Sequence, residues 1–506
     1  MRFALLVGLF AVFACQANRR PLPPPEPPSS APSERDRDVE MFARSYFPGR
    51  SGQIFLVTER GNFLVSRPDD VYRYMHGSPW EYDVEIPLLF HGAPYVAKGS
   101  FPGPANQQNV APTLLALLGS PVPTTMTGSA LTKALGNTSG EPPKAVFLAV
   151  LDGFGADTFE RLEPRLPTLA RLRREGAWFP DAAIDYLPTV TAAGHSTIST
   201  GADPRFHGIQ ANATFDRRTM KSDEPFPKLS PSNYMVLTLA DHWSLATSGR
   251  AVIVAQGTTP RAAVALAGHG ACMTNGRPIV MTMFDERKAG WVTNAECFRM
   301  PDYLEDDRAA KVWEKAGGTW MGHEIDSART LLRTALFPRF QAAALIEMIE
   351  KESVGRDEVP DLLLVNFKTP DYVSHQYGPA SEEMTESLVA LDSELARVLE
   401  ALDRAAGAGR YVVAITADHG MPPEPSGDDQ ARRYVEDILA SVNDRFDPEG
   451  RLVLDFDDPA NHQMYVDRDR MKELNLTLEQ VAAFLEELPF IRFAITEDEV
   501  RASPVR

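Results

Sequence analysis

The stretch AVFLAVLDG, residues 145–153, decides the fold class. Residues 145–151 are all apolar, and the run ends at Asp152-Gly153. An uninterrupted apolar run suits a strand that is buried on both faces, as in a parallel sheet covered by helices. In open α/β sheets, ligands bind beyond the carboxyl ends of such strands. The stretch therefore predicts a buried strand that places Asp152 at the ligand-binding edge of a sheet.

Two further stretches repeat this arrangement. DLLLVNFKTPDYVSHQYGP is mainly apolar over residues 362–367, and YVVAITADHG is apolar over residues 411–415. The metal-binding types of side chain that follow these two runs are Asp371, His375, Asp418 and His419. Since the carboxyl ends of parallel strands share one edge, we expect these side chains to converge with Asp152.

Strand-length apolar runs alternate with helical patterns through the rest of the chain. This alternation is typical of an α/β fold with a mainly parallel sheet sandwiched by helices. The chain has 506 residues, and after the N-terminal region it has no second long linker. We therefore expect a single catalytic domain over residues 40–506.

The N-terminal region predicts export. One Arg precedes an apolar run that ends at residue 14, too short to span a bilayer but suited to a signal peptide over residues 1–14. A buried N-terminal helix is the alternative. Cys15 stands in a context that resembles a bacterial lipobox, so a lipid anchor there is the membrane contact we expect. Residues 15–39 are rich in Pro and charged residues and predict an extended tether. The expected location is the periplasm or the outer surface of a bacterium.

The net charge indicates which classes of partner the protein binds, and the cysteines indicate whether a disulfide can form. The net charge of −18 disfavours nucleic acid, whose phosphates attract Lys and Arg surfaces. It leaves a small phosphate substrate open, because bound metal ions reverse the local charge. Cys272 and Cys297 either form a disulfide, which a secreted location permits, or remain two separate buried thiols.

The converging Asp and His side chains predict a metal site. Taken alone, Asp152 is explained by a helix cap or a turn, and the spacing of Asp371 and His375 also occurs by chance. The adjacent Asp418 and His419 after a buried strand are harder to explain without a cation, because a buried charge needs a partner. Together the set suits two divalent ions with nitrogen and oxygen ligands, zinc first.

A candidate nucleophile lies in DYLPTVTAAGHSTISTGADPRFHGIQAN, residues 185–212. Thr191 opens the small-residue stretch TAAGHSTIST after Pro188. A Thr at this position is most often a helix cap. Beside a metal site, the free N–H groups of a helix N-terminus attract an anion, and a metal ion lowers the pKa of a hydroxyl. The context therefore favours Thr191 as a nucleophile.

The order of these motifs resembles the alkaline phosphatase superfamily. D-G, T-x-T-x-x-G-H, D-x-x-x-H-x-x-G-P and A-D-H-G follow one another as in the type I phosphodiesterase/nucleotide pyrophosphatase group and its Thr-nucleophile bacterial alkaline phosphatases. The resemblance covers residues 42–506. It implies that Thr191 becomes phosphorylated and that Asn212 contacts a phosphoryl oxygen. It implies ligands for one metal at Asp152, Thr191, Asp418 and His419, and for the other at Asp371 and His375. We interpret three further histidines as structural: His195, His207 and His269.

The stretch HGSPWEYDVEIPLLFHG, residues 76–92, resembles a segment that stands near the C-terminus in the family. We therefore expect a circular permutation that has moved residues 40–136 to the front, with the new join at residues 136–144. The resemblance places Glu85 where the family has its last metal-ligating His. A Glu that binds here reduces the net charge of the site and shifts the preference towards manganese or another hard ion. The alternative is that Glu85 misses the metal and that this site is empty or weak.

A second departure from the family pattern concerns the residues that bind the phosphate oxygens. The monoesterase branch carries a Lys-x-Arg, and the resemblance places Thr259 at the Lys and Arg261 at the Arg. The resemblance thus implies an exported hydrolase of small phosphate esters that uses two divalent metals, zinc or manganese, and leaves monoesters and diesters equally open. The alternative is a catalytically impaired protein of the same fold that binds a metal or another ligand.

Overall fold

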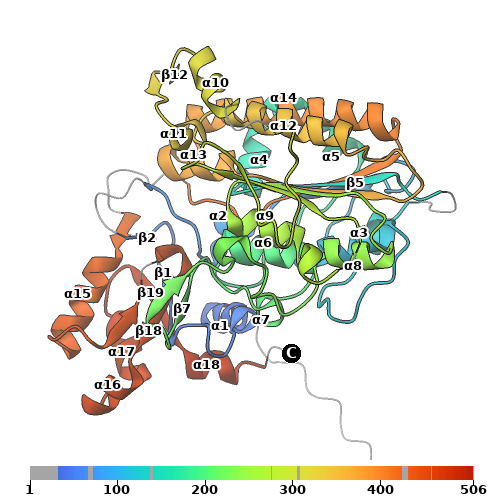
Figure 1. Cartoon of the computed structure of the whole chain (residues 1–506). Helices are drawn as coiled ribbons and strands as arrows, with labels where there is room; N and C mark the ends of the chain where they lie inside the picture. Colours follow the sequence, from blue (N-terminus) through green and yellow to red (C-terminus); the bar gives the residue numbers. More distant parts are fainter. Residues whose placement is uncertain are drawn as a thin grey trace, which may run out of the picture.

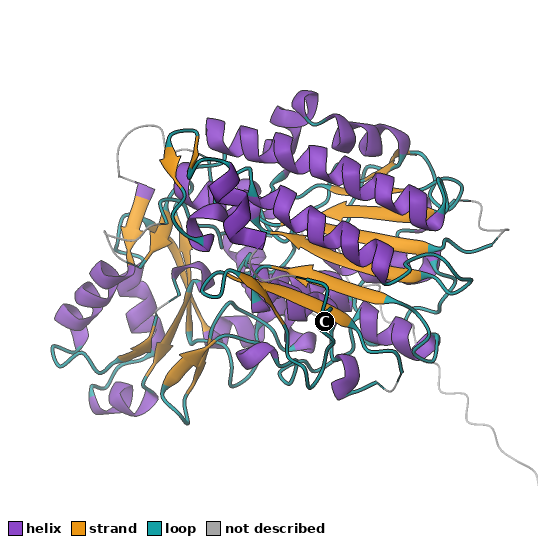
Figure 2. Ribbon diagram, turned by 45° about the horizontal axis from the view of Figure 1, so that its top comes forward, coloured by secondary structure: helices purple, strands orange, loops and turns teal. Residues whose placement is uncertain are grey.

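A computed structural model describes residues 32–66, 72–136, 141–274, 276–304, 308–423, 431–456 and 458–504. The expected signal peptide and the expected anchor at Cys15 lie outside the described residues. Within them, a large sheet is covered by helices on both faces, and a smaller sheet stands beside it (Figures 1 and 2). The α/β fold predicted from the alternating apolar runs is confirmed.

The large sheet has nine strands among the described residues, in the order β11-β10-β9-β14-β5-β15-β3-β6-β4. Its five central strands, from β10 to β15, are parallel. The strands are β11 (Gly290–Val292), β10 (Val280–Asp285), β9 (Ile253–Gly257), β14 (Asp361–Phe367), β5 (Ala145–Leu151), β15 (Tyr411–Thr416), β3 (Leu88–His91), β6 (Ala177–Trp178) and β4 (Gly99–Ser100).

The three strands expected to carry ligands are neighbours in the sheet. In β5, the register pairs Leu151 with Phe367 of β14, and Val150 with Thr416 of β15. Nearly every side chain of these strands is buried. Both faces of the sheet are covered, which explains why the runs are apolar without alternation.

Helices cover the two faces of the large sheet. One face carries α4 (Ala156–Leu162), α5 (Pro167–Glu175), α12 (Phe337–Lys351) and α14 (Glu382–Ala406), and the other carries α3 (Val110–Leu117), α6 (Thr191–Thr200), α8 (Leu239–Ala246) and α9 (Pro260–Ala267) (Figure 1). The longest helix, α14, begins after Ser381, whose hydroxyl accepts the Met384 N–H. Leu388, Leu391 and Leu395 are buried at the spacing of one helix face.

The smaller sheet joins the two ends of the chain. Its order is β17-β18-β1-β19, with β17 (Val453–Asp455), β18 (Gln463–Val466), β1 (Ile54–Thr58) and β19 (Ile491–Thr496). The N-terminal strand β1 is antiparallel to both of its C-terminal neighbours. Around it lie α15 (Val435–Phe446), α16 (Arg468–Glu473), α17 (Leu478–Leu485) and α18 (Glu497–Ala502).

The tether expected over residues 15–39 does not extend to residue 39. Helix α1 (Glu34–Ser45) begins inside it, after a capping box in which Ser33 and Asp36 bond to each other's backbone N–H groups. Met41 and Phe42 are buried. Glu34, Asp36 and Arg37, which belong to the charged composition that indicated a tether, are exposed on this helix.

Short elements complete the described chain. They are α2 (Glu81–Val84), α7 (Pro204–His207), α10 (Arg308–Lys315), α11 (Ala328–Leu331), α13 (Thr369–Tyr377), β2 (Phe63–Val65), β16 (Arg432–Tyr434), β7 (Thr214–Asp216), β8 (Lys221–Asp223), β12 (Thr319–Trp320) and β13 (His323–Glu324). Cys272 and Cys297 form a disulfide, the kind of bond that persists in oxidising compartments. In the part of the chain described here, none of the helices combines the length and the apolar character needed to cross a membrane.

Candidate active site

The carboxyl ends of β5, β14 and β15 bring three buried aspartates to one place. Asp152 follows β5 directly, Asp371 lies in the first turn of α13 after β14, and Asp418 lies two residues beyond β15. All three are at most 1% exposed. Three carboxylates in one buried region repel one another unless a cation is bound among them.

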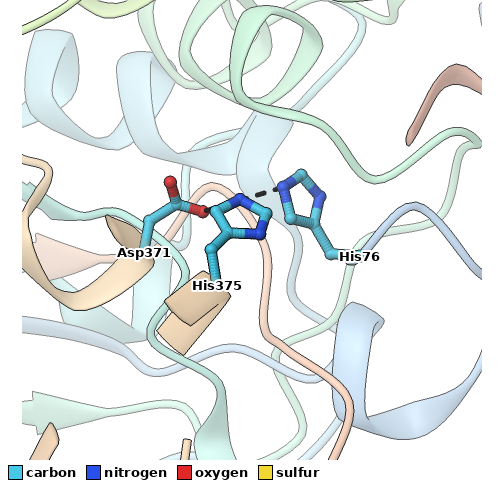
Figure 3. Close-up of side chains that lie close together, drawn as sticks. All are labelled: His76, Asp371 and His375. Atoms are coloured by element: carbon cyan, nitrogen blue, oxygen red, sulfur yellow. Dashed lines mark ion pairs between the residues drawn. The ribbon is translucent and has the colours of Figure 1, made fainter. Parts of the chain in front are cut away.

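The first cluster consists of His76, Asp371 and His375. Nε2 of His375 is 3.2 Å and Nε2 of His76 is 3.7 Å from Oδ1 of Asp371. Figure 3 shows the three side chains pointing toward one another. The three ligand atoms lie within 4.8 Å of one another. Two imidazoles and one carboxylate are a ligand set that suits zinc.

Backbone carbonyls fix the two imidazoles of the first cluster. Nδ1 of His76 is 2.7 Å from the Thr189 carbonyl oxygen, and Nδ1 of His375 is 2.6 Å from that of Tyr74. These bonds turn both Nε2 atoms toward Asp371, as in metal sites where the second ring nitrogen binds a carbonyl. Burial, followed by the neighbouring His419, holds the pKa of His76 well below its ordinary value. His76 is therefore neutral at pH 7, the form that binds a metal.

The structure corrects the expectation for Glu85. His76, at the start of the same stretch, lies beside Asp371 and His375, whereas Glu85 is exposed. Glu85 ends the single turn of α2 and lines a surface pocket with Glu34 and Arg37. The next residue, Ile86, points inward and is 1% exposed. Because the third residue is His76, the argument that a Glu lowers the charge of the site no longer applies.

A local signal for His76 was present in the sequence. His76 is followed by Gly77 and Ser78, whose N–H groups both donate to Oδ2 of Asp83, at 3.1 and 2.9 Å. Gly77 has a φ of 125°, and a Cβ there would lie 2.4 Å from the Ala460 carbonyl oxygen. A Gly in a left-handed turn bound by a buried Asp marks a loop that is held in one conformation.

The second cluster consists of Asp152, Asp418 and His419. Nε2 of His419 is 3.6 Å from Oδ1 of Asp152 and 3.4 Å from Oδ2 of Asp418. Nδ1 of His419 is 2.9 Å from the Gly420 carbonyl oxygen. The residues that the sequence predicted for one metal thus lie together, with Thr191 beside them.

Both clusters fit a cation. Oδ1 of Asp371 and Oδ2 of Asp418 are buried and accept no hydrogen bond from the described residues. Burial, followed by the Asp418 carboxylate, raises the pKa of Asp152 well above its ordinary value. A divalent ion would give these oxygens a partner and reverse that shift.

Thr191 is not a cap in this structure. Val190 occupies the cap position of α6 and makes no side-chain hydrogen bond, and Thr191 is the first helical residue. Its Oγ1 lies 3.4 Å from Nε2 of His419. The hydroxyl therefore faces the second cluster rather than the backbone of its own helix.

Two glycines allow the site to close. A Cβ on Gly153 would lie 2.9 Å from Cα of Asp371, and a Cβ on Gly194 would lie 2.7 Å from Cβ of Asp418. Real Cβ atoms do not approach other atoms so closely. The glycines of the D-G and G-H motifs thus let α6 and the β5 turn lie directly against the ligand residues.

A pocket of about 320 Å³ opens onto the first cluster and Thr191. Its walls include Thr191, Asn212, Arg261, Lys368, Asp371 and His375. Oδ1 of Asn212 accepts the Ala192 N–H at 3.0 Å, which places its amide beside the start of α6. Burial acts to lower the pKa of Arg261, but Asp458 and nearby tyrosines raise it above its ordinary value. Arg261 therefore carries its charge into the pocket.

Lys368 is a further site residue, besides His76, that sequence reasoning missed. It stands between β14 and α13, and its Nζ donates to Oδ1 of Asp152 at 2.7 Å and to Oγ1 of Thr191 at 3.0 Å. It also lies 2.7 Å from Oδ2 of Asp371. Burial acts to lower the pKa of Lys368, but Asp152 and Asp371 raise it above its ordinary value. The available signal was a Lys directly after a fully buried strand, three residues before a candidate ligand.

The remaining expected residues are Thr259 and the three histidines that we interpreted as structural. Thr259 is buried before α9 and is absent from the lining of the pocket. His207 pairs with Thr197 at 3.1 Å, which joins α7 to α6, and His269 pairs with Asp241 at 2.8 Å, which joins the segment after α9 to α8. His195, which we expected to be structural, lies at the second cluster. Its Nδ1 is 3.3 Å from Oδ2 of Asp418, and Asp152, His195 and Asp418 form a group that could hold a metal ion.

Several known proteins resemble this chain in sequence. The family described as Type I phosphodiesterase / nucleotide pyrophosphatase matches residues 146–490. Alkaline phosphatase PafA of Elizabethkingia meningoseptica is 27% identical over 446 residues, which cover 77% of this chain and 81% of PafA. Alkaline phosphatase PhoV of Synechococcus elongatus is 28% identical over 333 residues, with 56% and 60% covered.

A solved structure supports the fold. The crystal structure of wild-type alkaline phosphatase PafA superposes with a TM-score of 0.59 at 22% identity, covering 73% of this chain and 81% of that one. At this identity the likeness shows the fold alone. The family match, which spans well over half of the sequence, shows more: the chain belongs to the type I phosphodiesterase / nucleotide pyrophosphatase family, within the alkaline phosphatase superfamily.

Proposed function

We propose that this metal-dependent phosphohydrolase cleaves small phosphate esters through a covalent phospho-Thr191 intermediate, at a site for two divalent metal ions. The observation that carries the proposal is the position of Thr191. Its hydroxyl lies at the N-terminus of α6, beside the second cluster, and lines the pocket. The N–H groups at a helix N-terminus favour an anion at this point.

The chain offers ligands for both ions. His76, Asp371 and His375, whose ligand atoms lie within 4.8 Å of one another, would hold one ion. Asp152, Asp418 and His419 would hold the other, because Nε2 of His419 lies 3.6 Å from Asp152 and 3.4 Å from Asp418. When bound, such ions lower the pKa of a hydroxyl or a water molecule and stabilise charge on phosphoryl oxygens. The two imidazoles of the first cluster favour zinc, and the two carboxylates of the second also accept manganese.

The reaction proceeds in two steps, formation of the phospho-Thr intermediate and its hydrolysis. In the first, the Thr191 hydroxyl loses its proton to solvent, and the lone pair on Oγ1 forms a bond to phosphorus. The bond from phosphorus to the ester oxygen breaks, and that oxygen keeps the electron pair and takes a proton from water. In the second, a water molecule loses a proton and attacks phosphorus. The bond to Oγ1 then breaks, and Oγ1 regains its electron pair and a proton.

Phosphate monoesters are the proposed substrate class. A monoester carries two negative charges, and two cations, Arg261 and Lys368, line the pocket. Asn212, whose amide lies beside the start of α6, would hold a further phosphoryl oxygen. The relatives PafA and PhoV are named alkaline phosphatases, which supports the same class.

A paired hydrolysis assay tests the proposal. The purified protein would be given an aryl phosphate monoester and the matching diester, with zinc and then with manganese. We expect faster turnover of the monoester, and a loss of at least about 10³-fold in Thr191→Ala, because the nucleophile is removed. Thr219→Ala is the control, since Thr219 is an exposed turn residue. Turnover that survives in Thr191→Ala would overturn the phospho-Thr intermediate.

We also propose that the chain is a circular permutation of the family's usual order, with residues 40–136 moved to the front. Strand β1 pairs with β19, and Arg35 of α1 forms an ion pair with Glu499 of α18 at 2.7 Å. The two ends of the described chain thus lie together, as permutation requires. The family match begins at residue 146, directly after the proposed join at residues 136–144.

A rearranged chain tests the permutation. It would begin at residue 144 and carry residues 32–136 after residue 504. We expect the same far-ultraviolet circular dichroism, cooperative thermal unfolding and zinc binding as in the natural order. A rearranged chain that stays unfolded would contradict the proposal, because the usual order of the family would then be incompatible with these contacts.

A further inference from the structure

The ammonium group of Lys368 lies between the two clusters. Its three neighbours are Oδ1 of Asp152 at 2.7 Å, Oδ2 of Asp371 at 2.7 Å and Oγ1 of Thr191 at 3.0 Å. The Lys side chain is 3% exposed. A Lys ammonium has three donors, so these three oxygens account for all of them. One cation thus contacts the second cluster, the first cluster and the nucleophile at once.

We propose that Lys368 is a catalytic residue, a built-in cation that stands between the two metal clusters and stabilises the oxygen of Thr191 as it attacks. The inference rests on the proposed function, because it assigns a role in the same reaction. It goes beyond the family motifs, since Lys368 belongs to none of those that identified the site.

The contact with Thr191 defines the chemical role. Lys368 donates to Oγ1, so the proton of the Thr191 hydroxyl points elsewhere and can leave toward solvent. As negative charge develops on Oγ1, the hydrogen bond becomes charge-assisted and strengthens. After the bond to phosphorus forms, the same N–H lies beside the phosphoryl group. Lys368 keeps its proton throughout and forms no covalent bond.

The contacts with the carboxylates have a second consequence. Lys368 forms ion pairs with Oδ1 of Asp152 and Oδ2 of Asp371. The other oxygen of Asp371, Oδ1, faces His76 and His375. A fixed positive charge at this distance opposes the binding of a divalent ion. The same residue therefore weakens metal binding and accelerates the reaction, so removing it should change these two quantities in opposite directions.

These opposite effects on metal affinity and turnover distinguish a catalytic cation from a structural one. If Lys368 only held the aspartates in place, its removal would loosen the ligands, and both metal affinity and turnover would fall. If it is a built-in cation, the aspartates gain affinity for metal while the reaction loses a charge-assisted donor.

The test is Lys368→Met, with Lys144→Met as the matched control. Lys144 is also a buried Lys, and its Nζ donates to the Asp357 carbonyl oxygen at 2.7 Å, at the start of β5 and away from the pocket. Zinc affinity would be measured by competition with a chromophoric chelator, and turnover of an aryl phosphate at saturating zinc. Lys368→Met should bind zinc about 10-fold more tightly and lose about 10²–10³-fold in kcat. Lys144→Met should keep both values within about twofold of those of the unaltered protein.

Every other result contradicts either the role of Lys368 or the proposed function. Weaker zinc binding or an unchanged kcat in Lys368→Met would overturn the inference. Lys368→Gln, which keeps most of the side-chain length, is the second variant, and failure of both to fold in the presence of zinc would make Lys368 structural and overturn it as well. Absence of turnover in the unaltered protein would instead contradict the proposed function, whereas turnover that persists in Lys368→Met contradicts this inference alone.

Discussion

The two ligand clusters lie side by side but differ in composition. The first, His76, Asp371 and His375, has two imidazoles and one carboxylate. The second has two carboxylates, Asp152 and Asp418, and one imidazole. With neutral histidines the first cluster carries one negative charge and the second carries two. The second cluster therefore has the greater need for positive charge, and it is the one beside Thr191.

The clusters also differ in how the chain assembles them. The second comes from residues that directly follow buried parallel strands, so the sheet itself fixes their positions. The first depends on His76, which lies in a loop before α2. Its position is fixed by hydrogen bonds, to the Thr189 carbonyl oxygen and through the turn bound by Asp83. A cluster held by a sheet should resist local change, and one held by a loop should not.

Removal of His76 should produce the largest difference between the clusters. In His76→Ala the first cluster keeps only Asp371 and His375, and we expect its zinc affinity to fall by at least about 10²-fold, more than for loss of an outer hydrogen bond. The second cluster should keep its ion. Zinc content measured by elemental analysis after gel filtration should drop from two ions per chain to one.

Glu85→Ala is the matched control for that experiment, because Glu85 lies in the same stretch but is exposed. We expect zinc content and affinity within about twofold of those of the unaltered protein, as for a surface change away from the site. Loss of one ion in Glu85→Ala, with retention of both in His76→Ala, would reverse the assignment made from the geometry.

The difference between the clusters also explains how much of the fold and of the site could be predicted from the sequence. The strands over residues 145–151, 362–367 and 411–415 were predictable, because each is a mainly apolar run of strand length that an Asp follows within a few residues. The carboxyl ends of parallel strands share one edge of the sheet, so the convergence of Asp152, Asp371 and Asp418 was predictable too. The structure brings these three residues to one edge.

The loop-borne and unexpected residues were harder to predict. Choosing between His76 and Glu85 required knowing which side chain of residues 76–85 faces inward, and the backbone path of α2 decides that. Lys368 was overlooked because a Lys after a strand is ordinarily exposed. Only the structure shows that Asp152 and Asp371 surround it. In both cases the missing information was the direction of a side chain, which periodicity does not give outside regular elements.

A smaller effect should follow from loosening the loop that carries His76. Oδ2 of Asp83 accepts the N–H groups of Gly77 and Ser78 and the Ser78 hydroxyl, the last at 2.6 Å. Asp83→Ala removes these bonds without touching a ligand. Outer hydrogen bonds of this kind contribute about 10–100-fold to metal affinity, so we expect a loss in that range at the first cluster and none at the second. Competition with a chromophoric chelator would measure both sites.

Asp181→Ala provides the comparison, because Asp181 also accepts a Gly N–H, that of Gly103 at 2.7 Å, but is exposed and belongs to neither cluster. It should leave both affinities unchanged. If Asp83→Ala weakened the second cluster as much as the first, the two clusters would share one support, and the distinction between a sheet-held and a loop-held site would be wrong. Equal affinities in Asp83→Ala and Asp181→Ala would show instead that the Thr189 carbonyl bond is sufficient to hold His76.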